Sequence, residues 1–291
     1  MGIVARRGNE RRSWRIGLML FLFLALVTIA GLVALLEIGR PRRPSEIDQV
    51  QLIPQPFDVA EPGRLILDVH GIELAIEPGP SGGPVRIEGD IDAAGYRWSP
   101  EYSTYGDRGW TYRLQLLPTG LLNRVAPGPG NSLRVTLPRD APISLEGSVR
   151  GGEARIELGG LWIVDTLLSF GQGDHRIAFS QPLLRPMERL HLDAGMSELT
   201  LVELGNASPV DVRINKSVGD ACVDLRGAWQ SDSNIEVACG VARCDLHRPG
   251  DEDAVVALAG SDSALGNGDL PRIEVHLAGM LDNVEISERL P

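Results

Sequence analysis

The feature that most constrains this chain is a repeat in which a short alternating apolar segment follows a glycine. The repeats start at Gly152, Gly173, Gly195, Gly219 and Gly240, with steps of 21, 22, 24 and 21 residues. Apolar residues stand four and six positions after each glycine: Ile156 and Leu158, Ile177 and Phe179, Leu199 and Leu201, Val223 and Leu225, Cys244 and Leu246. A spacing of two indicates half-buried strands. Because so short a unit cannot bury its own apolar face, the repeats must stack, which predicts a β-solenoid with Leu199 and Val223 in one inward column.

An uncharged apolar run of 21 residues covers positions 16–36. At about 1.5 Å per helical residue this run spans a hydrocarbon core of about 30 Å. It is longer than the apolar region of a cleaved signal peptide, so we expect a retained transmembrane helix. Five arginines precede the run and three follow it, which favours a cytoplasmic N-terminus and an outside C-terminus.

Charge is divided unevenly along the chain. Residues 1–43 carry eight arginines against two glutamates, whereas the remainder carries 20 basic and 37 acidic residues. A domain this acidic is a poor partner for nucleic acid or anionic lipid, so no nucleic-acid partner is expected.

The organisation follows from these patterns. We expect a basic cytoplasmic tail over residues 1–15, the transmembrane helix over 16–36, a Pro-rich linker over 37–63 and an extracytoplasmic β-solenoid over 64–291. Short strands are predicted before the glycine repeats, at 64–69, 72–77, 85–91, 110–117, 132–137 and 143–149. Residues 249–271 break the period, and 272–277 and 283–287 close the domain.

The three cysteines, Cys222, Cys239 and Cys244, match no zinc spacing. Cys244 occupies an apolar inward position, which favours a buried thiol. A disulfide is the alternative if the domain lies outside the cytoplasm, and Cys239 with Cys244 is then the favoured pair because they flank the turn at Gly240.

Three segments carry a family resemblance: residues 132–158, 190–201 and 215–227. They resemble the "toastrack" putative-adhesin family, which is related to the C-terminal domain of LiaF-type cell-wall-antibiotic-response proteins. The resemblance covers roughly residues 64–290 and rests on strands and glycines, with no catalytic residues to carry over. It implies a β-solenoid outside a bacterial membrane and a link to envelope-stress sensing. LiaF-type proteins have several membrane spans, whereas one is expected here.

Candidate chemistry is sparse. Glu153, Asp174 and Asp220 follow repeat glycines and could form a carboxylate column for Ca²⁺, but Met196 and Val241 interrupt it, so turn chemistry is favoured. The five histidines are scattered, and His175 is expected to be a core or corner residue. We therefore expect no metal, no cofactor and no catalytic residues.

One segment, residues 96–112, holds all four tyrosines and two of the five tryptophans. Aromatic residues beside arginine are typical of recognition surfaces, whereas the alternative is cross-strand packing within a hairpin. We expect a projecting hairpin in which Trp110 and Tyr112 pack on the domain. The candidate recognition residues are Arg97, Trp98, Tyr102, Tyr105 and Arg108.

The sequence therefore predicts an all-β, single-stranded, β-helix-like solenoid preceded by one transmembrane helix in the bacterial cytoplasmic membrane. We expect a non-enzymatic interaction or envelope-stress sensory module whose partner is an envelope protein or a cell-wall glycan. The alternatives are a carbohydrate-active β-helix enzyme, which a groove lined by carboxylates would favour, and a self-assembling envelope scaffold.

Overall fold

A computed structural model describes residues 50–51, 62–92, 95–104, 109–120, 130–250, 253–258, 270–279 and 284–287. The chain divides into two compact units, Met1–Glu46 and Ile47–Pro291, and every described residue belongs to the second. The basic tail, the apolar run and almost all of the linker lie outside the described residues. Within the described part, no helix is long and apolar enough to cross a bilayer.

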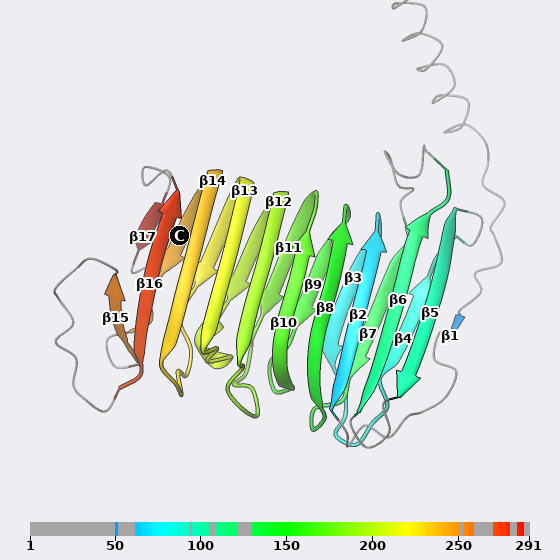
Figure 1. Cartoon of the computed structure of the whole chain (residues 1–291), viewed down its shortest axis with the longest axis horizontal. Coiled ribbons are helices and arrows are strands. Elements are labelled where there is room, and N and C mark those ends of the chain that lie inside the picture. Colours follow the sequence, from blue (N-terminus) through cyan, green and yellow to red (C-terminus); the bar gives the residue numbers. More distant parts are fainter. Residues whose placement is uncertain are drawn as a thin grey trace, which may run out of the picture. The chain divides into compact units, whose positions relative to one another are not determined.

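The described residues form an all-β, solenoid-like fold in which one sheet curls into two facing walls (Figure 1). In chain order, the strands are β1 (Val50–Gln51), β2 (Gly63–His70), β3 (Glu73–Pro78), β4 (Arg86–Asp90), β5 (Tyr96–Thr104), β6 (Trp110–Pro118), β7 (Ser132–Leu137), β8 (Pro142–Arg150), β9 (Ala154–Glu157), β10 (Trp162–Phe170), β11 (Gly173–Ala178), β12 (Arg189–Val202), β13 (Asp211–Asp224), β14 (Ser233–His247), β15 (Val255–Leu258), β16 (Arg272–Gly279) and β17 (Val284–Ser287). A short 3₁₀ helix, η2, covers Leu204–Asn206. The expected strand segments are confirmed to within a residue or two.

The front wall of Figure 1 runs from β15 and β16 through the first halves of β14, β13 and β12 to β10, β8, β2, β6 and β5. The back wall contains β17, the second halves of the three long strands, β11, β9, β3, β7, β4 and β1. Strands pair in parallel from rung to rung, apart from β5 against β6, β4 against β7 and β1 against β4, which are antiparallel. At this end of the stack β4 and β5 therefore run opposite to the other strands.

The order of rungs in space differs from their order in the chain. The first rung, β2 and β3, lies between the rung of β6 and β7 and the rung of β8 and β9. The chain forms this inner rung first, then builds outward to the end of the stack, and then returns across it. In this third of the domain the rungs therefore do not follow one another in chain order.

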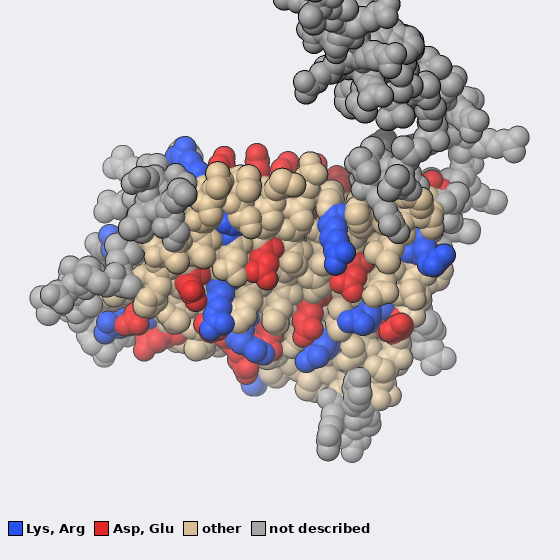
Figure 2. Space-filling model, turned by 45° about the horizontal axis from the view of Figure 1, so that its top comes forward, with Lys and Arg blue, Asp and Glu red and all other residues tan. Residues whose placement is uncertain are grey.

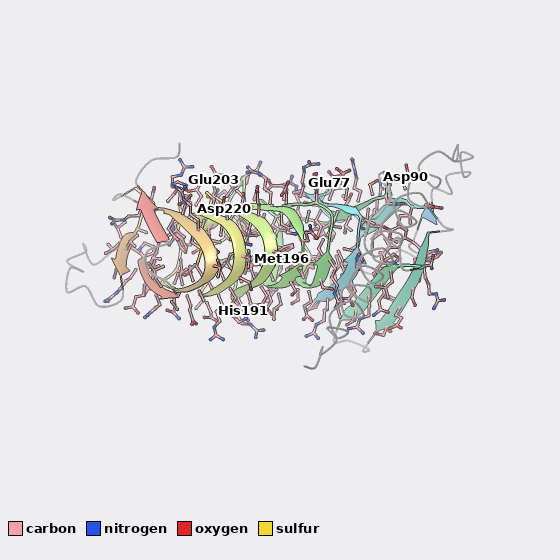
Figure 3. The ribbon with its side chains drawn as sticks, turned by 90° about the horizontal axis from the view of Figure 1, so that it is seen from above. Glu77, Asp90, His191, Met196, Glu203 and Asp220 are labelled. Carbon is pink, nitrogen blue, oxygen red and sulfur yellow. A yellow bond between two sulfur atoms is a disulfide. The ribbon has the colours of Figure 1, made fainter. Side chains whose placement is uncertain are left out.

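The two walls meet along an upper corner, which comprises residues 70–73, 150–153, 171–174, 195–198, 217–220 and 240–243. Figure 3 shows the long strands arching through this corner from one wall to the other. Inward residues five positions apart flank the corner in each rung: Val149 with Ala154, Phe170 with His175, Ala194 with Leu199, Lys216 with Ala221, and Cys239 with Cys244. The corner of four residues is therefore the unit that repeats.

This register corrects the alignment of the glycines. Gly173 pairs with Ser197 and Gly219 pairs with Ala242, so Gly195 and Gly240 belong to a position two residues earlier. Positive φ angles follow the corrected register, since Gly152, Gly173 and Gly219 have φ of 95°, 134° and 100°, whereas Gly195 and Gly240 do not adopt positive φ. The five glycines form two columns.

The core lies between the walls in continuous inward columns. One back-wall column contains Ile156, Ile177, Leu201, Val223 and Leu246, and all of these are buried. Leu199 is also buried, but it stacks between His175 and Ala221 in the neighbouring column. The inward orientation of Leu199 and Val223 is therefore confirmed, whereas their shared column is wrong. Each fully buried aliphatic side chain contributes about 1.5–3 kcal/mol.

Candidate functional site

The aromatic segment forms the end of the front wall. β5 pairs antiparallel with β6, and β6 pairs in parallel with β2, so the segment is part of the wall and the expected projection is wrong. Among the described strands, β5 has β6 as its only partner, which makes β5 a free edge (Figure 1). Residues 105–108, including Tyr105 and Arg108, lie outside the described part.

Half of this aromatic segment anchors the end of the stack. Tyr96, Trp110 and Tyr112 are buried, which confirms the expected packing role of the last two. The hydroxyl of Tyr96 donates a 2.8 Å hydrogen bond to the carbonyl oxygen of Gly71. Burial and then the negative charge of Asp92 raise the pKa of Tyr96, and burial raises the pKa of Tyr112 to about 12. Both phenols are therefore neutral at physiological pH.

Two further aromatic residues of the segment, both on β5, are exposed to solvent. Trp98 is 41% exposed and Tyr102 is 44% exposed, opposite the buried residues Leu116 and Tyr112 of β6. Because alternate residues of a strand share a side, Trp98 and Tyr102 lie on the core-facing side of the sheet, where the stack ends. Arg97 is also exposed, on the opposite side of β5.

The chemistry of this surface favours stacking over strand addition. Indole and phenol rings offer broad apolar faces with a polar tip, which suits sugar rings and extended peptides. Pro100, in the middle of β5, has no amide hydrogen to donate, and proline on an edge strand hinders pairing with another strand. A partner would therefore contact the side chains of β5 more readily than it would pair with the backbone of β5.

A carboxylate column follows the back edge of the upper corner. The register brings together Asp174, Glu198 and Asp220, so Glu198, and not Met196, occupies this position in the β12 rung. The column also includes Glu73 and Glu153 and ends at Arg243. The expected interruption at Met196 is therefore wrong, because Met196 lies outside the column. Val241 also lies outside it, and the column position in the β14 rung is held by Arg243.

A hollow of about 240 Å³ lies beside this column on the back wall. Its polar lining comes from Glu153, Asp174, Glu198, Arg155, Arg176 and Thr200. Arg155 pairs with Glu153 at 2.6 Å and with Glu73 at 3.6 Å, which holds one end of the column. Among the described residues, no three His, Cys, Asp or Glu side chains converge as metal ligands do.

His175 is a core residue, as expected, but its ring nitrogens have no hydrogen-bond partner among the described residues. The imidazole stacks on Phe170 with ring centroids 4.6 Å apart. Burial lowers its pKa to about 4; Asp174 opposes this shift, and the positive charge of Lys216 adds to it. The ring is neutral at physiological pH and serves as packing.

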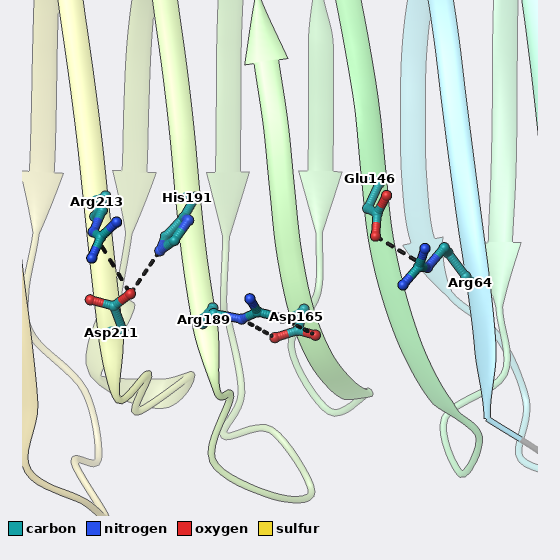
Figure 4. Close-up of polar contacts among 7 residues, drawn as sticks. All are labelled: Arg64, Glu146, Asp165, Arg189, His191, Asp211 and Arg213. Carbon is teal, nitrogen blue, oxygen red and sulfur yellow. Dashed lines mark hydrogen bonds and ion pairs between the residues drawn. The ribbon is translucent and has the colours of Figure 1, made fainter.

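Charged residues of the front wall form cross-strand pairs (Figure 4). Arg64 contacts Glu146 at 3.2 Å, and Arg189 contacts Asp165 at 3.0 Å. His191 lies 2.8 Å from Asp211. Exposed pairs of this kind contribute about 0–1 kcal/mol each, so they cover the wall without marking a site.

The three cysteines form one disulfide and leave one thiol free, as the disulfide alternative predicts. Cys239 and Cys244 are bonded across the upper corner, with Cα atoms 6.7 Å apart. Cys222 is free and half-buried, and burial raises the pKa of its thiol.

No family model and no curated protein matches the chain. The solved structures that resemble it include the following two. One is titled a "putative cell adhesion protein" from Clostridium sporogenes, with 11% identity, a TM-score of 0.39, and coverage of 80% of this chain and 95% of that chain. The other is titled a "putative adhesin" from Bacteroides fragilis, with 12% identity, a TM-score of 0.30 and the same coverage. At these TM-scores the similarities support no inference about function.

Proposed function

We propose that this chain is a membrane-anchored, extracytoplasmic interaction module of the bacterial envelope, without enzymatic activity, and that the β5 edge is its recognition surface. The observation that supports this proposal is the exposure of Trp98 and Tyr102 on β5, whereas Trp110 and Tyr112 of the neighbouring strand β6 are buried. Rigid aromatic side chains lose little conformational entropy when they bind a partner. A sensory role in envelope stress rests on the resemblance of residues 132–158, 190–201 and 215–227.

The location is proposed from the sequence of the N-terminal region. The uncharged run at 16–36 has the length of a bilayer span, and the arginine bias favours an outside domain. The Cys239–Cys244 disulfide supports the same location, because disulfides persist mainly in oxidising compartments. The full chain should sediment with membranes, and protease added outside should remove residues beyond about 40. Recovery of a soluble, processed domain would contradict the anchor.

The recognition surface is tested with the double variant Trp98→Ala/Tyr102→Ala in the full chain. The probes are a glycan array and soluble peptidoglycan fragments, and we expect loss of the glycan signal with nearly unchanged melting temperature. Leu117→Ala is the matched control, since Leu117 is also 44% exposed but lies on β6, across from Arg97. Unchanged binding by the double variant, or equal loss in the control, would reject β5 as the surface.

The back-wall hollow favours the carbohydrate-active alternative, because a carboxylate pair across rungs is the machinery of glycoside hydrolysis. Incubation of the full chain with envelope glycans would show release of reducing ends if this alternative is correct. Glu198→Gln would then abolish the release, whereas Trp98→Ala would leave the bond-cleaving step intact.

A further inference from the structure

The upper corner carries an exposed apolar row over three successive rungs. Met196, Val218 and Val241 are paired in register on β12, β13 and β14, and they are 66%, 43% and 73% exposed. Figure 3 shows Met196 at this edge, away from either wall. Figure 2, with the corner turned forward, shows an uncharged band below a row of acidic residues. Three aligned apolar side chains in solvent are a contiguous patch and not scattered surface residues.

An acidic row runs beside the apolar row on β12 and β13, where Glu198 and Asp220 stand two residues after Met196 and Val218. On β14 this position holds Arg243, whose charge is paired with Asp245 at 3.1 Å. Asp174, Glu198 and Asp220 stand in neighbouring rungs, which are about 4.8 Å apart in a sheet. None of these three carboxylates takes part in an ion pair with another described residue. Like charges in adjacent strands repel one another, so a positively charged partner would relieve this repulsion.

Two features beneath the surface, a buried lysine and a disulfide, hold these corners in place. Lys216 is buried, and its Nζ donates to the carbonyl oxygens of Gly195 at 3.0 Å, Ser197 at 2.6 Å and Val218 at 2.6 Å. These bonds tie together the corners that present Met196 and Val218. One rung further, the Cys239–Cys244 disulfide closes the corner that presents Val241. The apolar row is therefore presented by preorganised backbone, which lowers the entropic cost of binding.

We propose that this corner binds the apolar face of a short amphipathic helix whose apolar stripe is bordered by Lys or Arg. The pitch of an α-helix, about 5.4 Å, is close to the rung spacing of about 4.8 Å, so successive helical turns meet successive rungs. An extended strand places same-side residues about 6.8 Å apart and falls out of step within two rungs. The acidic row favours a positively charged partner, and it disfavours an anionic membrane surface.

This proposal does not depend on the β5 surface, which is built from other residues at the end of the stack. The test uses the full chain in phosphatidylcholine nanodiscs. The probe is a synthetic amphipathic helical peptide with a leucine stripe bordered by arginine and a photo-reactive group within the stripe. A second peptide carries glutamate in place of every arginine, and empty nanodiscs give the background.

The decisive variant is Met196→Ser/Val218→Ser/Val241→Ser, in which every changed side chain is exposed. We expect cross-links to map to residues 195–243, and their yield to fall by about tenfold or more in this variant. Leu184→Ser/Val210→Ser is the matched control, because Leu184 and Val210 are 56% and 51% exposed but lie outside the corner, and its yield should equal that of the parent. Glu198→Gln/Asp220→Asn should lower the yield and make it less sensitive to salt.

Equal labelling of the parent and the triple variant would overturn the proposal, as would equal labelling by the acidic peptide. Row-dependent binding to phosphatidylglycerol vesicles without labelling by the peptide would also overturn it, since the corner would then be a membrane contact. Trp98→Ala/Tyr102→Ala should leave the labelling unchanged, so the two surfaces succeed or fail separately. Circular dichroism melts of each variant confirm that the fold is retained.

Discussion

Lys216 reaches back across one rung and donates a 2.6 Å hydrogen bond from Nζ to the carbonyl oxygen of Ser197. Lys216 is the only lysine in the chain, and it lies in an inward column between Ala194 and Cys239. The ammonium group also donates to the carbonyl oxygens of Gly195 and Val218, so it satisfies backbone acceptors on both sides of the corner. This single lysine is therefore part of the core.

Replacement of Lys216 by methionine should destabilise the domain by about 2–3 kcal/mol. Methionine matches the length of lysine, but it removes the donor to the buried carbonyl oxygen of Ser197 and to the part-buried carbonyl oxygen of Val218. An unsatisfied buried group costs about 1–3 kcal/mol. Denaturant titration measures the change. Arg213→Met removes an exposed cation from the same strand and should cost less than about 0.5 kcal/mol. If Lys216→Met is as stable as the parent, the hydrogen bonds of Lys216 make no net contribution to stability.

Gly173→Ala and Gly195→Ala should differ sharply, although both glycines start a repeat in the sequence. Gly173 has φ of 134°, and a Cβ there would strike the carbonyl oxygen of Gly152. At Gly195 a Cβ would lie 3.4 Å from the carbonyl oxygen of Phe170, and φ is not positive. We expect the free energy of unfolding to fall by more than about 2 kcal/mol in Gly173→Ala and by less than about 1 kcal/mol in Gly195→Ala, as measured by thermal melts. Equal losses would restore the single-column alignment.

Local patterns account for what the sequence could predict. The alternation in residues 110–117 and 132–137 locates strands and their inward sides, because a period of two is a property of a few neighbouring residues. The register between rungs depends on the number of residues between one upper corner and the next, which changes by one to three residues from rung to rung. Aligning on glycine therefore placed Met196 beside Asp174, where Glu198 stands.

The order of the rungs in the stack could not be predicted from the sequence for a different reason. Nothing in β2 or β3 encodes that β6 and β7, which follow later in the chain, will lie on their outer side. The aromatic candidates were found from composition, since tyrosines cluster in one segment. The exposed row at the upper corner was missed, because Met196, Val218 and Val241 look like strand residues until the register aligns them.

Asp224→Ala should destabilise the domain by about 2–3 kcal/mol. Its carboxylate is buried and accepts hydrogen bonds from Arg226 Nε at 2.8 Å and Nη2 at 2.7 Å. Burial alone would raise the pKa of Asp224, but the bonds from Arg226 outweigh it and lower the pKa. This contribution is present at neutral pH and is lost as the pH falls through the lowered pKa.

The matched control for Asp224 is Glu198→Ala, which should change the free energy of unfolding by less than about 0.5 kcal/mol. Glu198 is exposed and has no ion pair among the described residues. Urea titrations of both variants at neutral pH decide the matter. Comparable effects at the two positions would show that the Asp224–Arg226 pair is dispensable.

Reduction of the Cys239–Cys244 disulfide should cost about 2 kcal/mol, because the bond closes a short loop and restricts the unfolded chain. Thermal melts with and without dithiothreitol measure the difference. Cys239→Ala/Cys244→Ala should melt at the same temperature in both conditions and match the reduced parent within a few degrees. Cys222→Ser should keep the full response to dithiothreitol, and loss of that response would mean that Cys222 takes part in the bonding.

Stability should fall as the pH drops from about 6.5 to about 4, and His175 should cause part of this fall. In the folded state burial lowers the pKa of His175 to about 4, below the ordinary value of 6.5. Between these values the unfolded state binds the proton and the folded state does not, so acid favours unfolding by up to about 3 kcal/mol. Above pH 6.5 both states are neutral at this ring, and the contribution vanishes.

His175→Leu isolates this contribution, because leucine suits an apolar column that already contains Ala154 and Leu199. The variant should be at least as stable as the parent at pH 7.5, since the two unpartnered ring nitrogens are removed. Its free energy of unfolding should decline less steeply between pH 6.5 and pH 4 in urea titrations. His276→Gln, at an exposed position, serves as the control and should follow the parental profile. If His175→Leu and the parent decline in parallel, the ring is protonated in the folded state, and the corner must open to solvent around it.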